Sequence, residues 1–215
     1  AGADLMEGGS GDDIYTIDDA GDRILEGADG GDRDRANIFV DYTNPANVEY
    51  VAGLFAGRGL TIQGNDARES IVGANRIQSP DTIMGNGGDD RLVGLVGDDM
   101  IFGGAGRDRI YGNSGDDVIV GGLGNDRLTG QFGNDRFVHA PGDGLDGVTD
   151  FTTTGVDADV VDLTAHNIPD FETLRALMVN QANGTLINLG IDEGVVLLGV
   201  FFGRLHEDDF LLSSP

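Results

Sequence analysis

Cysteine, tryptophan and lysine are all absent from the 215 residues, so every basic side chain other than histidine is an arginine. A chain without cysteine forms no disulfides and offers no thiolate to a metal. The sequence also lacks an apolar run long enough to cross a bilayer. It has no HExxH zinc motif, no GxSxG nucleophile elbow and no Gly-Lys-Ser/Thr phosphate loop. We therefore expect no enzymatic activity within these residues.

Positive charge is also scarce, with 13 basic against 38 acidic residues and a formal net charge of -25. This balance repels nucleic acid phosphates and anionic membranes, so we expect neither nucleic acid binding nor membrane insertion. High acidity with few aromatics can also indicate disorder. Here 39% of the residues are hydrophobic and regularly spaced, which favours a folded chain, especially with bound polyvalent cations.

Six nonapeptides follow one another without a gap through residues 85–138. They read GNGGDDRLV, GLVGDDMIF, GGAGRDRIY, GNSGDDVIV, GGLGNDRLT and GQFGNDRFV. Positions one and four are always glycine, position six is always aspartate, and position eight is always a large apolar residue. A pattern that keeps its phase over so many copies indicates a repeat architecture.

Less regular copies flank this block. Asp81 keeps the register in RIQSPDTIM, and residues 64–72 (GNDARESIV) carry Glu69 at the acidic position, with about three extra residues between positions 73 and 84. Another copy, GGSGDDIYT, occupies residues 8–16. No signal peptide precedes it and the chain opens inside a repeat, so we expect a fragment of a longer protein.

Simple stereochemistry accounts for the spacing. Glycine at positions one and four permits backbone angles that are closed to other residues. Six residues of each repeat can then form a tight turn and the other three a short strand, so two repeats complete one coil with a strand on each side. The apolar residue at position eight becomes part of a continuous apolar column when many coils stack.

Stacking also aligns the aspartates of position six. Asp90, Asp108 and Asp126 fall on one edge, and Asp81, Asp99, Asp117 and Asp135 fall on the other. Stacked strands lie about 4.8 Å apart, where two carboxylates repel by roughly 3 kcal/mol at an effective dielectric constant of about 20. Summed over the neighbouring pairs, this repulsion rivals the whole stability of a domain, about 5–15 kcal/mol. The stack should therefore not persist without a cation.

Calcium is the cation that suits these columns. It prefers oxygen ligands and accepts six to eight of them in flexible geometry, which carboxylates and turn carbonyls can supply. Magnesium demands stricter octahedral geometry and keeps its water. Zinc would require histidine or cysteine, and neither stands in the six repeats.

The nonapeptide resembles the calcium-binding repeat of the RTX (repeats-in-toxin) family. The resemblance implies an all-β fold, a parallel β-roll in which backbone carbonyls of positions one to four and the aspartates of stacked coils share about five calcium ions. The implied ligands in the roll are Asp81, Gly85, Gly87, Gly88, Asp90, Gly94, Val96, Gly97, Asp99, Gly103, Gly104, Ala105, Gly106, Asp108, Gly112, Asn113, Ser114, Gly115, Asp117, Gly121, Gly122, Leu123, Gly124, Asp126 and Asp135.

The roll is predicted to span residues 64–138, after an irregular, strand-rich segment of partial repeats at residues 1–63. Within that segment, residues 48–54 and 59–64 read as further rungs. Four of its acids could ligate one or two additional ions or could simply form a solvated surface. They are Asp13, Asp22, Glu26 and Asp34.

Residues 139–215 are predicted to form a β-rich cap with one short helix. Asp146 and Asp150, in a loop at residues 141–151, are possible ligands of a last ion. Residues 159–164 predict a strand, with Asp157, Asp159 and Asp162 as solvated edge residues.

The remaining residues of the cap predict one helix and one hairpin. Apolar spacing predicts a helix that begins at Asp170 and ends at Asn183-Gly184, followed by a hairpin of residues 185–190 and 194–200. Residues 208–212 (DDFLL) loosely resemble an uncleaved type I secretion signal, although a short capping helix or strand fits equally well. The histidines are far apart in the sequence and lack metal-site spacing, so we expect no site from His139, His166 and His206.

The leading interpretation is a secreted, calcium-dependent folding module. Calcium is scarce inside cells and millimolar outside them, so the chain would stay loose until export and then fold by binding calcium. The resemblance implies export by type I secretion machinery, attachment to an upstream domain, and an extracellular or bacterial cell-surface location. Two alternatives are an adhesion module that presents outward residues such as Phe102 and Tyr111 to a surface or polysaccharide, and the C-terminal part of an enzyme whose catalytic domain lies upstream.

Overall fold

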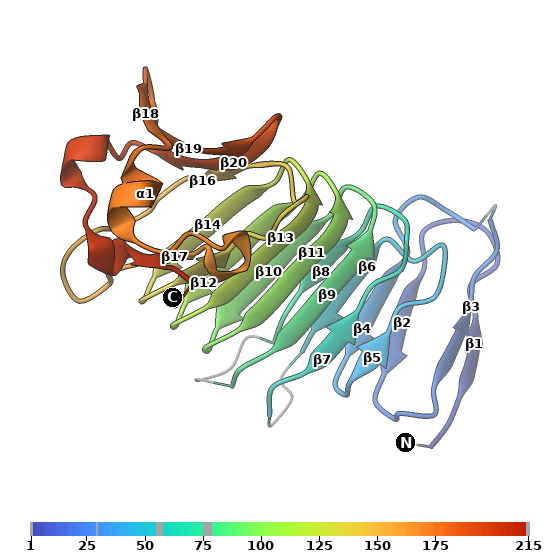
Figure 1. Ribbon diagram of the computed structural model, residues 1–215. Coiled ribbons are helices and arrows are strands. Elements are labelled where there is room, and N and C mark those ends of the chain that lie inside the picture. The colour runs from blue at the N-terminus through green and yellow to red at the C-terminus, as the bar shows by residue number, and fades with distance from the viewer. Residues whose placement is uncertain (1, 29, 55–57, 75–78, 214–215) are drawn as a thin grey trace.

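The computed structural model describes residues 2–28, 30–54, 58–74 and 79–213. The described strands stack into a parallel β-solenoid of about eight turns, as the repeats predict (Figure 1). Successive strands alternate between two sheets, so each coil contributes one strand to each face. A parallel sheet suits this chain because each short strand gains a partner on both sides from the coils before and after it.

Among the described residues, the larger sheet has 11 strands. In order of position these are β2 (Ile14–Ile17), β4 (Arg35–Ile38), β6 (Tyr50–Gly53), β8 (Ser70–Val72), β10 (Arg91–Val96), β12 (Arg109–Ser114), β14 (Arg127–Phe132), β16 (Leu145–Val148), β20 (Glu193–Leu198), β19 (Gly184–Gly190) and β18 (Met178–Gln181). The strands from β2 to β20 pair in parallel, and the last two, β19 and β18, pair in antiparallel order.

The opposite sheet has eight strands, and a separate parallel pair lies at the N-terminal end. The eight are β5 (Tyr42–Thr43), β7 (Thr61–Gln63), β9 (Thr82–Gly87), β11 (Met100–Gly106), β13 (Val118–Gly124), β15 (Arg136–Val138), β17 (Val160–Asp162) and β21 (Phe210–Leu211). The separate pair consists of β1 (Leu5–Glu7) and β3 (Arg23–Leu25).

The strand register confirms the predicted coil of two nonapeptides. Leu92 pairs with Ile110 and Ile101 pairs with Ile119, a separation of 18 residues in both sheets. The spacing is looser before the block, since Ile62 pairs with its counterpart 21 residues later in β9. Both sheets nevertheless continue on either side of residues 64–138, the predicted bounds of the roll.

The apolar residues of position eight fill the space between the sheets, as predicted. They are at most 2% exposed and include Leu92, Ile101, Ile110, Ile119, Leu128 and Phe137. The same core continues toward the N-terminus through Ile38, Val51 and Ile71, and toward the C-terminus through Val148 and Val161. One inward side chain per strand is sufficient because the stack joins these side chains into a single column.

The glycines of the repeat serve two different purposes. Position-four glycines do adopt the left-handed backbone expected of them, for example Gly106 with φ of 141°. Position two shares this conformation, as at Gly104 with φ of 108°. Position-one glycines do not, so the backbone explanation is wrong for them. They are required for space, as the metal centre shows below.

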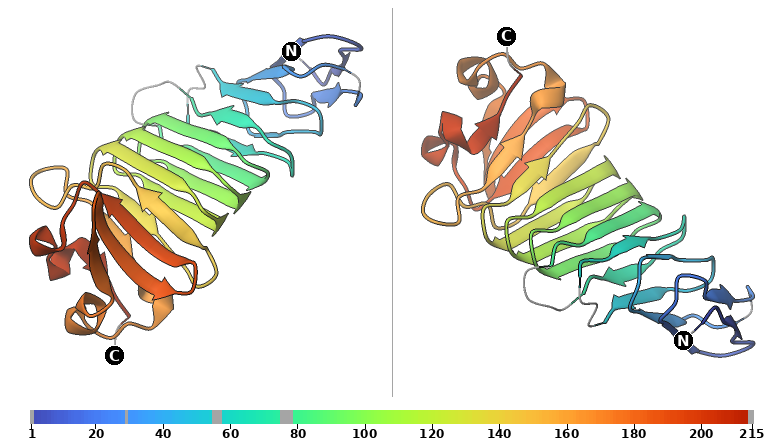
Figure 2. Two further views of the ribbon diagram at one scale, coloured as in Figure 1. Left: turned by 90° about the horizontal axis from the view of Figure 1, so that it is seen from above. Right: turned by 90° about the horizontal axis from the view of Figure 1, so that it is seen from below.

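The C-terminal cap extends the larger sheet and closes one end of the solenoid, with the N-terminal coil at the opposite end (Figure 2). β20 pairs in parallel with β16, and β19 and β18 then add to it in antiparallel order, which confirms the predicted hairpin of residues 185–200. Its helical elements are η1 (Thr164–His166), α1 (Phe171–Arg175), η2 (Phe202–Arg204) and η3 (Glu207–Asp209). Among the described residues, no helix has the length and apolar character needed to cross a membrane.

The predicted helix is correct at its start and wrong at its end. Asp170 caps α1, because its carboxylate accepts the backbone N–H of Thr173 at 2.7 Å. The helix stops at Arg175, and residues 178–181 form β18. Asn183-Gly184 turns the chain into β19 instead of ending a helix. Pairing with the exposed edge of β19 outweighs the weak helical preference of this segment.

Candidate metal centre

The position-six aspartates form two columns, one along each edge of the solenoid. In both columns, the Oδ1 atom of each aspartate accepts a backbone N–H from one coil earlier, and the donor is the acidic residue of that coil except at Asp81, whose Oδ1 accepts the N–H of Leu60. The first column contains Asp90, Asp108, Asp126 and Asp146, with N–H···Oδ1 distances of 2.8–3.0 Å. The second contains Asp81, Asp99, Asp117, Asp135 and Asp159, with distances of 2.7–3.0 Å. One oxygen of each carboxylate is thereby fixed by the backbone.

In seven of these nine carboxylates, the second oxygen is buried and lacks a hydrogen-bond donor within the part of the chain that the structure describes, whereas Oδ2 of Asp81 and of Asp159 accepts a backbone N–H. This holds for the Oδ2 atoms of Asp90, Asp99, Asp108, Asp117, Asp126, Asp135 and Asp146. Their residues are between 1% and 4% exposed. Buried polar atoms are normally paired, and an unpaired carboxylate oxygen is especially costly. A row of such atoms therefore indicates a missing positive partner.

Position-one glycines make room for this second oxygen. A Cβ atom built on Gly112 would overlap Asp117 Oδ2, and one built on Gly121 would overlap Asp126 Oδ2. The carbonyl oxygen of the next coil crowds the same space at Gly103. Every larger residue would displace the carboxylate, which explains a glycine whose backbone angles are ordinary.

Burial raises the pKa of the column carboxyl groups strongly. The pKa rises to about 7 for Asp90, Asp99, Asp126 and Asp135, and to about 8 for Asp117 and Asp146. Like charges on neighbouring acids also raise these values but rank below burial, and the backbone N–H donors oppose both effects. Loss of solvation, more than the mutual repulsion emphasised from the sequence, makes the ionised columns unfavourable without a cation.

Calcium fits the donor set of both columns. The unpaired atoms are carboxylate oxygens, the type of ligand that calcium prefers, and each lies beside the turn that begins with its position-one glycine. The predicted carbonyl ligands lie in these turns, on β9 to β13 and their connections. Which individual carbonyls ligate an ion stays a prediction.

The columns continue beyond the six repeats, and the sequence identified only part of this extension. Asp146 accepts the backbone N–H of Asp126 at 3.0 Å and so lies in line with the first column, as its prediction as a calcium ligand requires. Asp150 lies apart from the column positions, and its two oxygens accept the backbone N–H groups of Gly130 and Gln131. Asp159, predicted to be a solvated edge residue, is only 5% exposed and continues the second column. An inserted loop puts it 24 residues after Asp135 instead of 18, which hid the match.

Asp162 is the second acid wrongly predicted to be a solvated edge residue. It is 2% exposed and forms an ion pair with Arg136 of the preceding coil. The hydrogen bonds from this guanidinium and from Thr164 hold the pKa of Asp162 below its usual range, although burial opposes them. The arginine comes from the neighbouring coil, so the pairing could not be read from the local sequence.

At the N-terminal end the structure brings together three of the four predicted acids. Asp13, Glu26 and Asp34 each offer an oxygen within 4.8 Å of the others. The Oδ2 atoms of Asp13 and Asp34 lack a donor among the described residues, whereas Glu26 accepts the hydroxyl of Tyr15. This cluster extends the first column, because the N–H of Asp13 donates to Asp34 Oδ1 at 2.7 Å.

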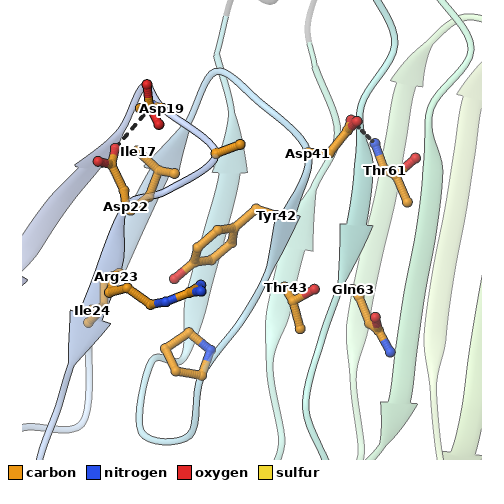
Figure 3. Close-up of a pocket in the computed structure, with 12 residues that line it drawn as sticks. Ile17, Asp19, Asp22, Arg23, Ile24, Asp41, Tyr42, Thr43, Thr61 and Gln63 are labelled. Atoms are coloured by element: carbon orange, nitrogen blue, oxygen red, sulfur yellow. Dashed lines mark hydrogen bonds between the residues drawn. The ribbon is translucent and has the colours of Figure 1, made fainter. Parts of the chain in front are cut away.

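Asp22 does not join this cluster. Its Oδ1 accepts the N–H of Asp4 at 2.9 Å, and its Oδ2 accepts those of Asp18 and Asp19. Asp22 instead lines a pocket of about 330 Å³. Tyr42 of β5 lines the same pocket (Figure 3). Since backbone donors already occupy both oxygens, its carboxylate differs from those of the columns.

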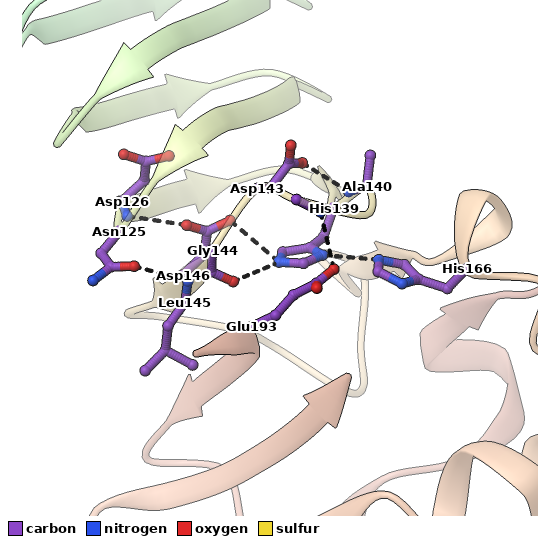
Figure 4. Close-up of polar contacts among 11 residues, drawn as sticks. Asn125, Asp126, His139, Ala140, Asp143, Gly144, Leu145, Asp146, His166 and Glu193 are labelled. Carbon is purple, nitrogen blue, oxygen red and sulfur yellow. Dashed lines mark hydrogen bonds and ion pairs between the residues drawn. The ribbon is translucent and has the colours of Figure 1, made fainter. Parts of the chain in front are cut away.

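Two histidines that were expected to be unrelated are in contact. His139 Nδ1 lies 2.9 Å from His166 Nε2, and the rings stack with their centroids 5.1 Å apart (Figure 4). The expectation from sequence distance was wrong because the cap folds η1 back against the end of the roll. Their separation of 27 residues carries no motif that would have revealed the pair.

Comparison with known proteins agrees with these repeats. The sequence model of the RTX calcium-binding nonapeptide repeat family, which comprises four copies, matches residues 1–16, 79–110 and 111–145. The matched segments contain most of both columns and the N-terminal Asp13. A search of curated proteins finds no match.

Proposed function

We propose that this protein, which carries RTX calcium-binding repeats in a β-solenoid, is a module that folds on calcium after secretion and supports a larger extracellular protein. The observation that carries the proposal is the row of buried Oδ2 atoms without donors. The chain binds the Oδ1 atoms with its own backbone and leaves seven of the column Oδ2 atoms to a cation. At neutral pH the folded roll therefore requires filled metal sites.

This coupling turns the free energy of calcium binding into free energy of folding. Bound calcium would supply the positive charge that offsets the cost of burying the carboxylates. Each column aspartate touches the coil before it and the coil after it, so adjacent sites share residues. Shared residues make the gain cooperative, because filling one site orders part of the next.

The extracellular setting follows from the calcium concentrations. Millimolar calcium outside the cell matches the weak end of protein calcium sites, and the much lower level inside does not. Export of a loose chain by type I machinery, followed by folding outside, suits a protein whose order depends on this difference. The net charge of -25 would also keep the unfolded chain expanded during export.

A calcium titration followed by circular dichroism tests the proposal. We expect a loose chain in chelator, a steep gain of β signal with calcium, and little response to magnesium. Asp108→Ala and Asp117→Ala should raise the midpoint. Asp66→Ala, which removes an exposed carboxylate of the irregular repeat, is the control and should leave it nearly unchanged. A chain equally ordered in chelator would contradict the proposal.

The two alternatives have less support. Tyr111 and Phe102 point outward but are half-buried, and the guanidinium of Arg91 lies 5.2 Å from the Tyr111 ring centroid. An adhesion role would be supported by calcium-dependent binding in a screen of glycans and cells. The module itself is proposed to lack catalysis, and an enzyme reading requires an active domain upstream of these residues.

A further inference from the structure

Two histidines and a glutamate converge where the roll meets its C-terminal cap (Figure 4). His139 follows β15, His166 ends η1, and Glu193 begins β20, so three separate segments contribute. Their possible ligand atoms all lie within 4.8 Å of one another. We propose that His139, His166 and Glu193 bind one divalent transition-metal ion, of which zinc fits best, with ligands separate from those of the calcium columns and next to the end of the first column, since His139 Nε2 lies 3.8 Å from Asp146 Oδ2.

The distance between the imidazoles suits such an ion. Two nitrogen ligands of tetrahedral zinc, at Zn–N distances of about 2.0–2.1 Å, lie about 3.3 Å apart. His139 Nδ1 and His166 Nε2 are 2.9 Å apart. An increase of a few tenths of an ångström, together with a shift of the shared hydrogen from His166 Nε2 to Nδ1 of the same ring, would convert this hydrogen bond into a pair of metal ligands.

The surroundings of His139 leave the required nitrogen free. Its Nε2 lies 3.1 Å from the carbonyl oxygen of Gly144 and 3.8 Å from Asp146 Oδ2, and a carbonyl can only accept a hydrogen bond. In the neutral ring, Nε2 therefore carries the hydrogen and Nδ1 keeps its lone pair toward His166. A ligating histidine normally donates its other N–H to a carbonyl or carboxylate in this way. His139 is also 2% exposed, so this orientation is held by packing.

The third ligand and the local charge favour a cation. The backbone N–H of Gly142 donates to Glu193 Oε1 at 3.1 Å and holds this side chain beside the imidazoles. Glu193 and Asp143 both lie close enough to act on His166 with their negative charge, whereas burial lowers the pKa of that histidine. Two imidazoles and one carboxylate form a common zinc set, with the fourth position left to water.

The donor set also separates this ion from calcium. Calcium prefers oxygen, whereas imidazole favours zinc, copper and nickel. The ion would join the last coil of the roll to η1 and to the first residue of β20. In a chain without cysteine, it would take the place of a disulfide in fixing the cap to the roll.

Calorimetric titration of zinc into the full chain tests the proposal. Millimolar calcium should be present, so that the roll is folded and failure of the calcium proposal is scored separately by circular dichroism. We expect one zinc ion per chain. His166→Gln and Glu193→Gln should each weaken binding by at least about tenfold, since loss of even an outer partner of a metal ligand costs roughly 10- to 100-fold.

His206→Gln is the matched control, because His206 is exposed and outside the cluster. It should keep the zinc affinity of the unchanged protein. Cobalt as a probe should give the visible absorption of a tetrahedral site in the control and lose it in His166→Gln. Absence of zinc binding, or equal binding by all variants through the acidic columns, would overturn the proposal.

Discussion

The two halves of the solenoid satisfy their buried acids in different ways. In residues 81–146, each column aspartate has an Oδ2 without a donor among the described residues, with Asp81 as the exception because its Oδ2 accepts the N–H of Ala74. In residues 41–74, the protein itself supplies the donors. Glu69 accepts the side-chain amides of Asn44 and Asn65 and the N–H of Asn65.

On the opposite side, Asp41 is an exposed acid that also has protein donors. Its two oxygens accept both terminal nitrogens of Arg58 at 2.9 and 2.8 Å, and Oδ1 also accepts the N–H of Thr61. At the buried Glu69, two asparagines thus occupy the role that calcium is proposed to take further along the chain. The need for a cation is therefore a local property of the repeats, and a parallel stack of coils does not by itself impose it.

Calcium removal should produce the largest difference in stability between the two halves. In chelator, the amides of β9 to β14 should lose nearly all protection from hydrogen exchange, because their columns would be buried without a counter-charge. Those of β6 to β8 should keep more protection. Exchange measured by mass spectrometry with and without calcium gives the comparison, with magnesium as the control. Uniform loss would show that the solenoid unfolds as one unit and that the distinction fails.

Acid should partly replace calcium in the columns. The folded pKa values of about 7–8 for Asp99, Asp117 and Asp146 exceed the unfolded value of about 3.9. Without metal, their contribution to stability is therefore fully present below about pH 4 and is lost as the pH rises through about 7–8.

Circular dichroism in metal-stripped buffer should thus show more β structure at about pH 5.5 than at about pH 8. With calcium present, the midpoint concentration should instead rise as the pH falls below about 7, because protons compete for the same oxygens. A metal-free chain that is equally loose at both pH values would refute this balance.

One acid from each half makes the comparison at single residues. Asp117→Asn should reduce the number of calcium ions bound and destabilise the calcium form by roughly 3–5 kcal/mol, as expected when one member of a buried charged set is removed. Glu69→Gln should leave the number of ions unchanged, since its donors are protein groups. Equilibrium dialysis with metal analysis measures both. Loss of calcium in Glu69→Gln would erase the contrast.

The smallest expected effect concerns the glycine that faces each carboxylate. Gly112→Ala should cost roughly 1–3 kcal/mol of stability in calcium, because the new methyl group collides with Asp117 Oδ2. Gly147→Ala is the matched control, since its Cβ would meet only Asp126 O at 3.8 Å. Thermal unfolding in saturating calcium provides the measurement. Equal stability of the two variants would remove the proposed reason for glycine at position one.

The regular block was the most predictable part of the molecule. Leu92 and Ile110 occupy equivalent positions 18 residues apart, and one inward residue per strand requires stacking, so the core followed from spacing alone. The membership of Asp108 and Asp117 in opposite columns followed from the same arithmetic. The 18-residue spacing did not identify Asp159, because a loop lengthens the interval before it. It also did not identify Glu49, which lies only 15 residues after Asp34 and accepts the N–H of Asp34 at 2.9 Å.

The cap was less predictable. Its β18 strand depends on the free edge of β19, and the His139–His166 contact depends on how η1 folds against the last coil. Local preference and periodicity do not contain such information, because partners come from segments brought together only in the folded chain. The ion pair of Asp162 with Arg136 of the coil before it has the same origin.

The sequence by itself determined the repeat, the coil length, the apolar column and the two files of aspartates, since each follows from a fixed period and the size and charge of its residues. Tertiary structure decided which carboxylate oxygens the backbone satisfies and which it leaves unpaired, because that depends on the amide donors of the neighbouring coil. It also decided where arginine, asparagine or a pair of histidines meets an acid, since these contacts join segments with no common period.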